Sequence, residues 1–229
     1  MPLHLYFTNF AKELKKTLMI RGLFAILIAV PIFCYSQISS NPEARYLLDQ
    51  VSAETDKHEA IQIVFEYHLN NKAENIQEKT NGELTLKGNQ YILSFMGIEQ
   101  ISDGENVWTV MEDDEEVQIS EIDLDDENAI TPSNLLKMYE DGFIYQMGEK
   151  NGNFQIVKLL PENPEDVDYI KIHLLINTQL KQIKSLKQFG ENNTESEYII
   201  NNFSPTIIND TTFTFNKADY LDFDIIDLR

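Results

Sequence analysis

An alternation of apolar and polar side chains recurs along most of this chain and constrains its fold more than any other feature. Apolar side chains occupy every odd position from Ile61 to Leu69, and polar Gln62, Glu66 and His68 lie between them. A period of two places alternate side chains on opposite faces of a β-strand, so that one face is buried while the other meets water. The pattern predicts a strand in this segment.

Similar patterns predict about ten or eleven strands in all. Short links separate most of them, which favours antiparallel pairing of sequential strands. Gly88-Asn89 is a predicted turn, and an acidic tip at 112–116 joins two strands into a predicted hairpin. The further candidate strands are 84–86, 91–95, 107–111, 117–119, 143–148, 154–160, 169–177, 180–189, 195–203 and 212–215.

Two or three short helices complete the expected fold, and two of them can be placed. The first has Asn41 as N-cap and Pro42 in the first turn, and an apolar stripe extends to about Thr55. Thr131-Pro132-Ser133 opens the second helix, whose apolar residues are Leu135, Leu136, Met138 and Tyr139. No repeat or linker divides the chain, so residues 37–229 are predicted to form a single, mainly β (α+β) domain.

Residues 1–36 have the features of a signal peptide. Basic residues between Lys12 and Arg21 precede an apolar run of about twelve residues, which is too short to span a membrane comfortably. Small residues at Cys34 and Ser36 favour cleavage before Gln37. Export is therefore expected; a retained anchor helix is the alternative, and either Met1 or Met19 is compatible with the start.

Cysteine and charge exclude several classes of function. Cys34 is the only cysteine, so the chain after residue 36 has no disulfide, cysteine nucleophile or thiolate metal site. The formal net charge is −20, and residues 37–229 hold 14 basic and 37 acidic side chains. Such a surface repels phosphate backbones, which argues against nucleic-acid binding. It keeps the protein soluble and monomeric and favours encounters with basic partners.

Motifs for catalysis or metal binding are missing from the sequence. His58, His68 and His173 are not spaced as a zinc-binding pair, and no Gly-x-Ser-x-Gly nucleophile turn occurs. The acidic runs 112–116 and 123–127 lack the glycine and ligand spacing of a calcium loop, and are interpreted as solvated turns. We therefore expect neither an enzyme nor a bound metal or cofactor.

Four landmarks together resemble the LolA family of periplasmic outer-membrane lipoprotein carriers. They are GELTLK from residue 82, the aromatic strand YILSF from residue 91, the turn and strand SDGENVW from residue 102, and the tail made of FTF at 213–215 and DIIDLR from residue 224. With the order of the expected elements, the resemblance spans residues 42–229.

The resemblance implies an incomplete, strongly curved antiparallel barrel with short helices as a lid over an apolar cavity. Such a carrier takes acylated lipoproteins from an inner-membrane ATP-driven lipoprotein-releasing complex to an outer-membrane acceptor, in the periplasm of a Gram-negative bacterium. Exposing acyl chains to water costs about 0.8 kcal/mol per methylene, so they need such shelter. The alternative function is a periplasmic lipid- or lipoprotein-sensing module of the same fold that regulates a membrane partner.

Particular residues follow from this resemblance. Lys87 stands where the family usually has an arginine associated with lid closure and loading, and it is the nearest basic substitute, although lysine lacks the planar guanidinium fork. Alternating apolar residues are also the ordinary core of a sheet, and the sequence leaves both interpretations open. The expected cavity lining is Phe65, Leu84, Leu86, Tyr91, Leu93, Phe95 and Trp108, with Leu47, Leu48 and Val51 on the lid helix.

Overall fold

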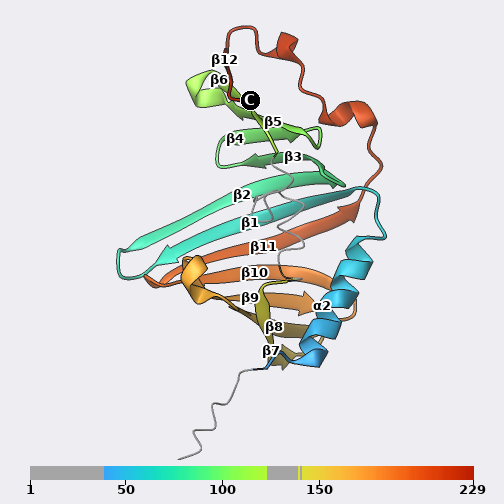
Figure 1. The fold of residues 1–229 in the computed structure, drawn as a ribbon, viewed down its shortest axis with the longest axis vertical. Coiled ribbons are helices and arrows are strands. Elements are labelled where there is room, and N and C mark those ends of the chain that lie inside the picture. Colours follow the sequence, from blue (N-terminus) through green and yellow to red (C-terminus); the bar gives the residue numbers. More distant parts are fainter. Residues whose placement is uncertain (1–38, 123–138, 140) are drawn as a thin grey trace, which may run out of the picture. The chain divides into compact units, whose positions relative to one another are not determined.

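The computed structural model describes residues 39–122, 139 and 141–229 (Figure 1). Ser39–Arg229 form one compact unit. The expected signal peptide and the expected helix from Thr131 to Met138 lie outside the described residues. In the described part of the chain, no helix is both long and apolar enough to cross a bilayer.

Twelve strands of the described residues form one sheet in the order β12-β6-β5-β4-β3-β2-β1-β11-β10-β9-β8-β7. Neighbouring strands are antiparallel except β12, which runs parallel to β6. The strands are β1 (Ile61–Asn71), β2 (Ile76–Lys87), β3 (Gln90–Phe95), β4 (Ile98–Ser102), β5 (Asn106–Met111), β6 (Glu116–Glu121), β7 (Phe143–Asn151), β8 (Phe154–Pro161), β9 (Tyr169–Asn177), β10 (Gln182–Gly190), β11 (Thr194–Pro205) and β12 (Asp224–Asp227).

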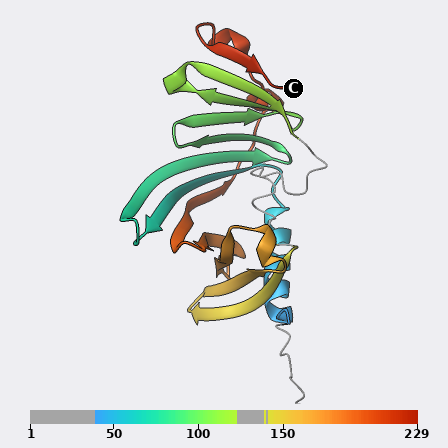
Figure 2. The same cartoon turned by 60° about the vertical axis from the view of Figure 1, so that its left-hand side comes forward.

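The sheet bends but does not close, since β7 and β12 are its two ends. Figure 2 shows long β1 and β2 curving along their length. The predicted fold class, a curved and mainly antiparallel incomplete barrel with a helical lid, is confirmed. The central pair is β1 with β11, which joins the N-terminal meander to the C-terminal one.

Helix α2 (Pro42–Thr55) begins where the sequence predicts. The Asn41 side-chain Oδ1 accepts hydrogen bonds from the backbone N–H groups of Glu43, at 2.8 Å, and Ala44, at 3.0 Å. This capping satisfies two donors that a helix start leaves without intrahelical partners. The Asn41 N–H donates to the Tyr145 carbonyl at 2.8 Å, which fixes the start of the helix to β7.

The face of the sheet that α2 covers is called the inner face. A set of buried residues, the covered cluster, lies between α2 and β7–β10 on this face. Its side chains interlock from both elements and exclude water from this half of the sheet. The covered cluster is Ala44, Leu48, Val51, Tyr139, Phe143, Tyr145, Val157, Leu159, Ile172, Leu174 and Ile176.

Three elements differ from the sequence predictions. β4 and β12 were not predicted: the sequence of β4, Ile-Glu-Gln-Ile-Ser, lacks a regular alternation, and only pairing with β3 and β5 makes it a strand. Residues 212–215 were expected to be a strand. The structure instead has a 3-10 helix at Asp210–Phe213, and its turn buries Phe213 almost completely.

Candidate functional site

Six of the seven predicted lining residues share the inner face. Leu84 pairs with Leu93 and Leu86 with Tyr91 between β2 and β3, while Gly82 pairs with both Phe95 and, on β1, Phe65. Cross-strand partners point to the same face of a sheet. These six belong to one group, the inner cluster, made of Ile61, Ile63, Phe65, Leu84, Leu86, Tyr91 and Val107, with Leu93, Phe95, Ile122, Tyr198, Ile200 and Phe203 packed against them.

A glycine shapes the centre of the inner cluster. The Phe65 ring lies over Gly82, where an added Cβ would stand 2.3 Å from the ring atom Cζ. From this position the ring contacts Phe95, at 5.4 Å between centroids, and Tyr198, at 5.9 Å. Glycine at this strand position therefore lets three aromatic rings meet.

Burial is uneven within the inner cluster. Ile61, Ile63 and Tyr91 are nearly inaccessible to solvent, whereas Leu93 and Phe95 are only partly buried. Partly buried large apolar side chains retain surface that another apolar group can cover, and each covered Å² contributes about 25 cal/mol. Hydrocarbon can therefore bind to the partly buried side chains of the cluster while the packing of its most buried side chains stays intact.

The polar atoms of the cluster belong to tyrosines. Burial raises the pKa of Tyr91 to about 12 and also raises that of Tyr198, where nearby Tyr67 acts in the same direction. The Tyr67 hydroxyl donates a 3.4 Å hydrogen bond to Ser196 Oγ. The phenols of Tyr91 and Tyr198 stay neutral at physiological pH, so they add no charge to the apolar surface.

Trp108, the seventh predicted lining residue, lies on the opposite face of the sheet, so its predicted place in the lining is wrong. It pairs with Ile101 and Ile119, whereas its neighbour Val107 belongs to the inner cluster. One step along a strand reverses the face, so the two adjacent apolar residues cannot both line the same surface. The Trp108 ring stacks on Phe215 at 5.6 Å, beneath the C-terminal segment.

The predicted lid residues pack away from the inner cluster. Leu48 and Val51 are part of the covered cluster, and partly buried Leu47 packs against the same group. The two clusters adjoin across β10, where Leu186 pairs with Leu174 of the covered cluster on one side and with Tyr198 of the inner cluster on the other. Helix α2 therefore borders the inner cluster rather than contributing to it.

Lys87, predicted to control the lid, lies at the end of β2. Its Nζ is 3.1 Å from Oε1 of Glu59, in the segment that connects α2 to β1. Glu59 is largely exposed, and an exposed ion pair contributes at most about 1 kcal/mol. The contact links the β2–β3 turn to the segment that follows the helix.

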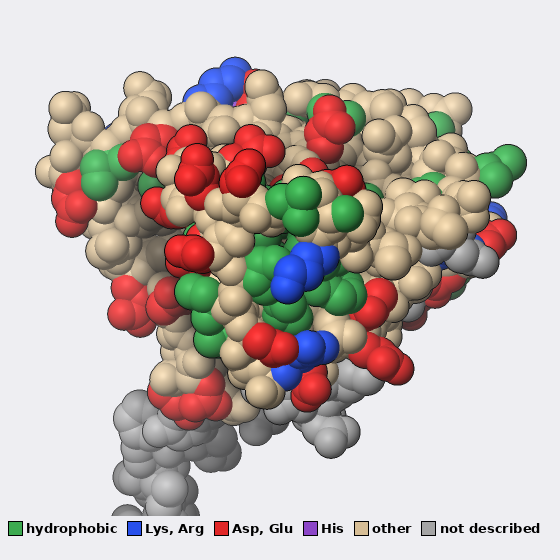
Figure 3. Space-filling model, turned by 90° about the horizontal axis from the view of Figure 1, so that it is seen from above, with side chains coloured by type: hydrophobic (Ala, Val, Ile, Leu, Met, Phe, Trp, Pro, Cys, Tyr) green, Lys and Arg blue, Asp and Glu red, His purple; other side chains and the backbone are tan. Residues whose placement is uncertain are grey.

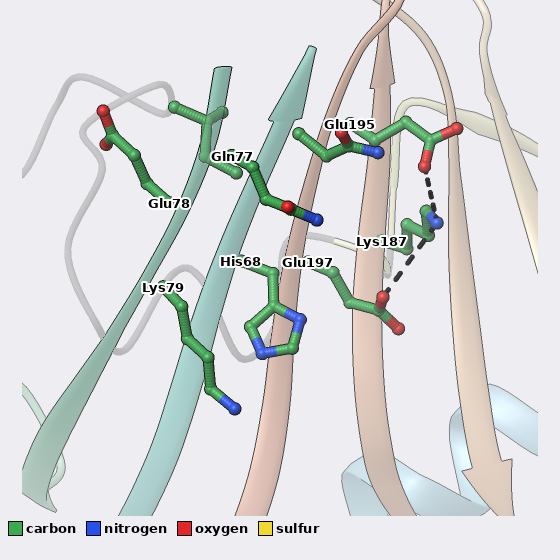
Figure 4. Close-up of a pocket in the computed structure, with 9 residues that line it drawn as sticks. His68, Gln77, Glu78, Lys79, Lys187, Glu195 and Glu197 are labelled. Carbon is green, nitrogen blue, oxygen red and sulfur yellow. Dashed lines mark ion pairs between the residues drawn. The ribbon is translucent and has the colours of Figure 1, made fainter. Parts of the chain in front are cut away.

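A polar hollow of about 420 Å³ lies over the opposite, outer face of the sheet (Figure 4). Lys187 contacts Glu195 at 2.8 Å and Glu197 at 4.0 Å, and both contacts are drawn in the figure. Charged groups in such a place favour water over acyl chains. The lining is His68, Leu69, Asn70, Gln77, Glu78, Lys79, Lys187, Glu195 and Glu197.

Acidic side chains outnumber basic ones in the sequence, 38 to 18, and one end of the molecule shows how they are arranged. Viewed from the end that carries β6 and β12, acidic side chains surround a group of hydrophobic ones (Figure 3). Exposed apolar side chains of the C-terminal segment include Leu221 and Leu228. Among the described residues, no three or more His, Cys, Asp or Glu side chains gather in a way that suits a metal ion.

Sequence reasoning missed about half of the inner cluster. Ile61 and Ile63 show the same alternation as Phe65, and this signal was available. Tyr198, Ile200 and Phe203 join only because β11 pairs with β1, more than a hundred residues away in the chain. Their pattern predicts a strand but not its neighbour.

No protein-family model and no curated protein matches the sequence. Solved structures match in fold. An uncharacterized conserved protein from Thermus thermophilus has a TM-score of 0.54 at 11% identity, with 81% of this chain and 99% of that chain covered.

Two further similar structures have lower TM-scores. A LolA superfamily protein from Nitrosomonas europaea matches with a TM-score of 0.42 at 11% identity, covering 75% of this chain and 97% of its own. The lipoprotein LppX from Mycobacterium tuberculosis matches with a TM-score of 0.45 at 10% identity, and the match covers 74% of this chain and 99% of LppX. At identities of 10–11%, a likeness to these solved structures concerns the fold alone.

Proposed function

We propose that this protein shelters the acyl chains of lipoproteins on the inner cluster and carries them through the periplasm from the inner to the outer membrane. The observation that supports this most is the partial burial of Leu93, Phe95 and their aromatic neighbours on one face of a bent, open sheet. A carrier must release what it binds, and a partly covered apolar surface holds hydrocarbon less firmly than a closed core does.

The surrounding elements fit this proposal. Helix α2 would serve as the wall of the site, and moving it would uncover Leu47, Leu48 and Val51. Lys87, through Glu59, would couple the β2–β3 turn to the segment behind α2 during loading. Lipoproteins would arrive from an inner-membrane ATP-driven releasing complex and leave for an outer-membrane acceptor, while this chain performs no covalent chemistry.

Binding of a fluorescent fatty acid tests the acyl site. Leu93→Glu places a charge on the inner face, which acyl chains disfavour, and we expect binding to weaken at least about tenfold, since a buried unpaired charge costs several kcal/mol. Ile207→Glu is the matched control, because Ile207 is fully exposed. Circular dichroism checks that both variants fold. Unchanged binding by folded Leu93→Glu contradicts the site.

Mass spectrometry of ligands bound to the protein purified from its own periplasm tests the passenger. We expect acylated species in near-stoichiometric amounts. If crosslinked cells yield a defined protein domain and no acylated species, the regulatory alternative, a lipid- or lipoprotein-sensing module, replaces the carrier proposal.

A further inference from the structure

Strand β2 extends well beyond its neighbour β3, which leaves part of its edge open. β2 begins at Ile76, but β3 pairs with it only from Gly82 to Lys87. Figures 1 and 2 show β1 and β2 projecting past the shorter β3. On the side away from β1, residues 76–81 have no backbone partner among the described residues.

The open edge is long enough to pair with another strand. Six residues at about 3.3 Å each extend over about 20 Å. Four of the six are exposed, and Ile76 and Thr80 are partly buried. Backbone N–H and C=O groups at such an edge form hydrogen bonds with any extended chain that lies alongside.

A pocket of about 340 Å³ lies where this open edge meets the end of β3. Phe95 and Ile98 in its lining belong to the inner face, whereas Asn81 and Ser94 point to the outer face. Residues of both faces can line one pocket only at an edge of the sheet. The pocket therefore occupies the place where β3 would continue if it matched the length of β2.

The rim of this pocket is apolar and exposed. Met96 and Gly97 form the two-residue turn between β3 and β4, both with positive φ, of 55° and 76°. This turn leaves Met96 51% exposed and Ile98 39% exposed. Next to them, Phe95 contacts Phe65 and Tyr67 of the inner face. An apolar path thus leads from the open edge to the inner cluster.

We propose that the open edge of β2 at 76–81 binds an extended peptide as an added antiparallel or parallel strand, with its side chains resting on Met96 and Ile98. This inference rests on the proposed function and deepens it: the peptide is the extended segment next to the acylated end of the passenger. The acyl chains lie on the inner cluster while the first residues of the polypeptide pair with β2.

The charges around the open edge define the peptide further. Glu78 lies on the edge, and Glu99 and Glu112 line the pocket. Lys79, the basic residue of this edge, has its Nζ 2.7 Å from Oε2 of Glu66. Like charges so close together disfavour an acidic segment, so the preferred peptide is neutral or basic.

The test compares two synthetic diacylated lipopeptides with the same acyl chains and the same six-residue Ser/Thr/Lys segment. In one of them, alternate peptide bonds are N-methylated, which removes the donors that strand pairing needs. We expect the unmodified lipopeptide to bind full-length protein at least about tenfold more tightly, because N-methylation removes backbone hydrogen bonds that stabilise the added strand. The backbone amides of residues 76–81 should exchange more slowly with deuterium when the unmodified lipopeptide is bound, and should not slow when the N-methylated one is bound.

Variants separate the peptide site from the acyl site. Met96→Asp adds a charge at the exposed rim, and we expect it to lose the preference for the unmodified lipopeptide while it still binds fatty acid. Ile207→Asp should keep both the preference for the unmodified lipopeptide and the binding of fatty acid. Equal binding of the two lipopeptides with fatty-acid binding intact overturns the peptide site alone, whereas failure of the folded wild-type protein to bind fatty acid overturns the acyl site and this inference together.

Discussion

The two halves of the inner face have the same strand alternation but are filled differently. Over β7–β10, the covered cluster consists largely of aliphatic side chains with no accessible surface, such as Val157, Leu159 and Leu174. Over β1–β3, β5 and β11, the inner cluster is richer in aromatic residues and is partly exposed at Leu93 and Phe95.

The difference shows how one sheet can combine stability with a binding surface. A helix that packs into a sheet completes a rigid core on one half, because interiors at high packing density leave no space for a guest. The other half stays attached to that core through β1–β11 pairing, so it does not have to hold the fold together alone. Each prediction below tests this contrast.

The largest expected effect is on the free energy of unfolding. Leu174→Ala should lower it by about 3–4 kcal/mol, because a fully buried leucine leaves a cavity when it is truncated. Leu93→Ala, in the partly exposed half, should cost about 1–2 kcal/mol, because less surface is lost and water can enter. Urea unfolding followed by circular dichroism measures both. Equal losses would mean that the two halves are packed alike.

High pH should destabilise the protein through Tyr91. Burial raises its pKa to about 12 in the folded protein, against about 10 in the unfolded chain. Below pH 10 both states keep the proton; above it the unfolded state ionises first, so stability falls between pH 10 and 12 by about 2–3 kcal/mol from this group.

Comparison with Tyr91→Phe isolates this contribution, since other tyrosines titrate in both proteins. The wild-type free energy of unfolding should fall more steeply than that of Tyr91→Phe as the pH rises from 10 to 12. Parallel curves would show that water reaches the Tyr91 hydroxyl, and that the centre of the inner cluster is more open than its burial indicates.

Gly82→Ala should have a smaller effect, about 1–2 kcal/mol of stability, because the new Cβ displaces the Phe65 ring. In a Phe65→Ala background the same change should cost far less, since the ring that it meets is gone. Urea unfolding of the four proteins gives the coupling. An equal cost in both backgrounds would place the strain in the backbone rather than in the aromatic group.

Local signals predicted much of the fold. Asn41 and Pro42 placed the start of α2, because capping depends on neighbours in the chain. The alternation from Ile61 to Leu69 placed β1, and the acidic tip at 112–116 joined β5 to β6. By contrast, β4 and β12 have weak alternation, and their strand conformation depends on the partners beside them.

The candidate site was predicted only where strand neighbours are also chain neighbours. Leu84, Leu86, Tyr91 and Leu93 come from one hairpin, so their shared face follows from its two-residue turn. Trp108 was assigned to the wrong face because its register is fixed two strands further on. Tyr198 and Phe203 entered the cluster through long-range pairing with β1, which no local pattern specifies.

The sequence by itself determined helix α2 and most of the strands, because periodicity and capping act over a few residues. Only the tertiary structure decided that β1 and β11 pair and that α2 packs on one half of the inner face. It also decided that β2 is longer than β3. The first two of these features depend on contacts between distant segments, whose free energy is gained only once the whole sheet has formed.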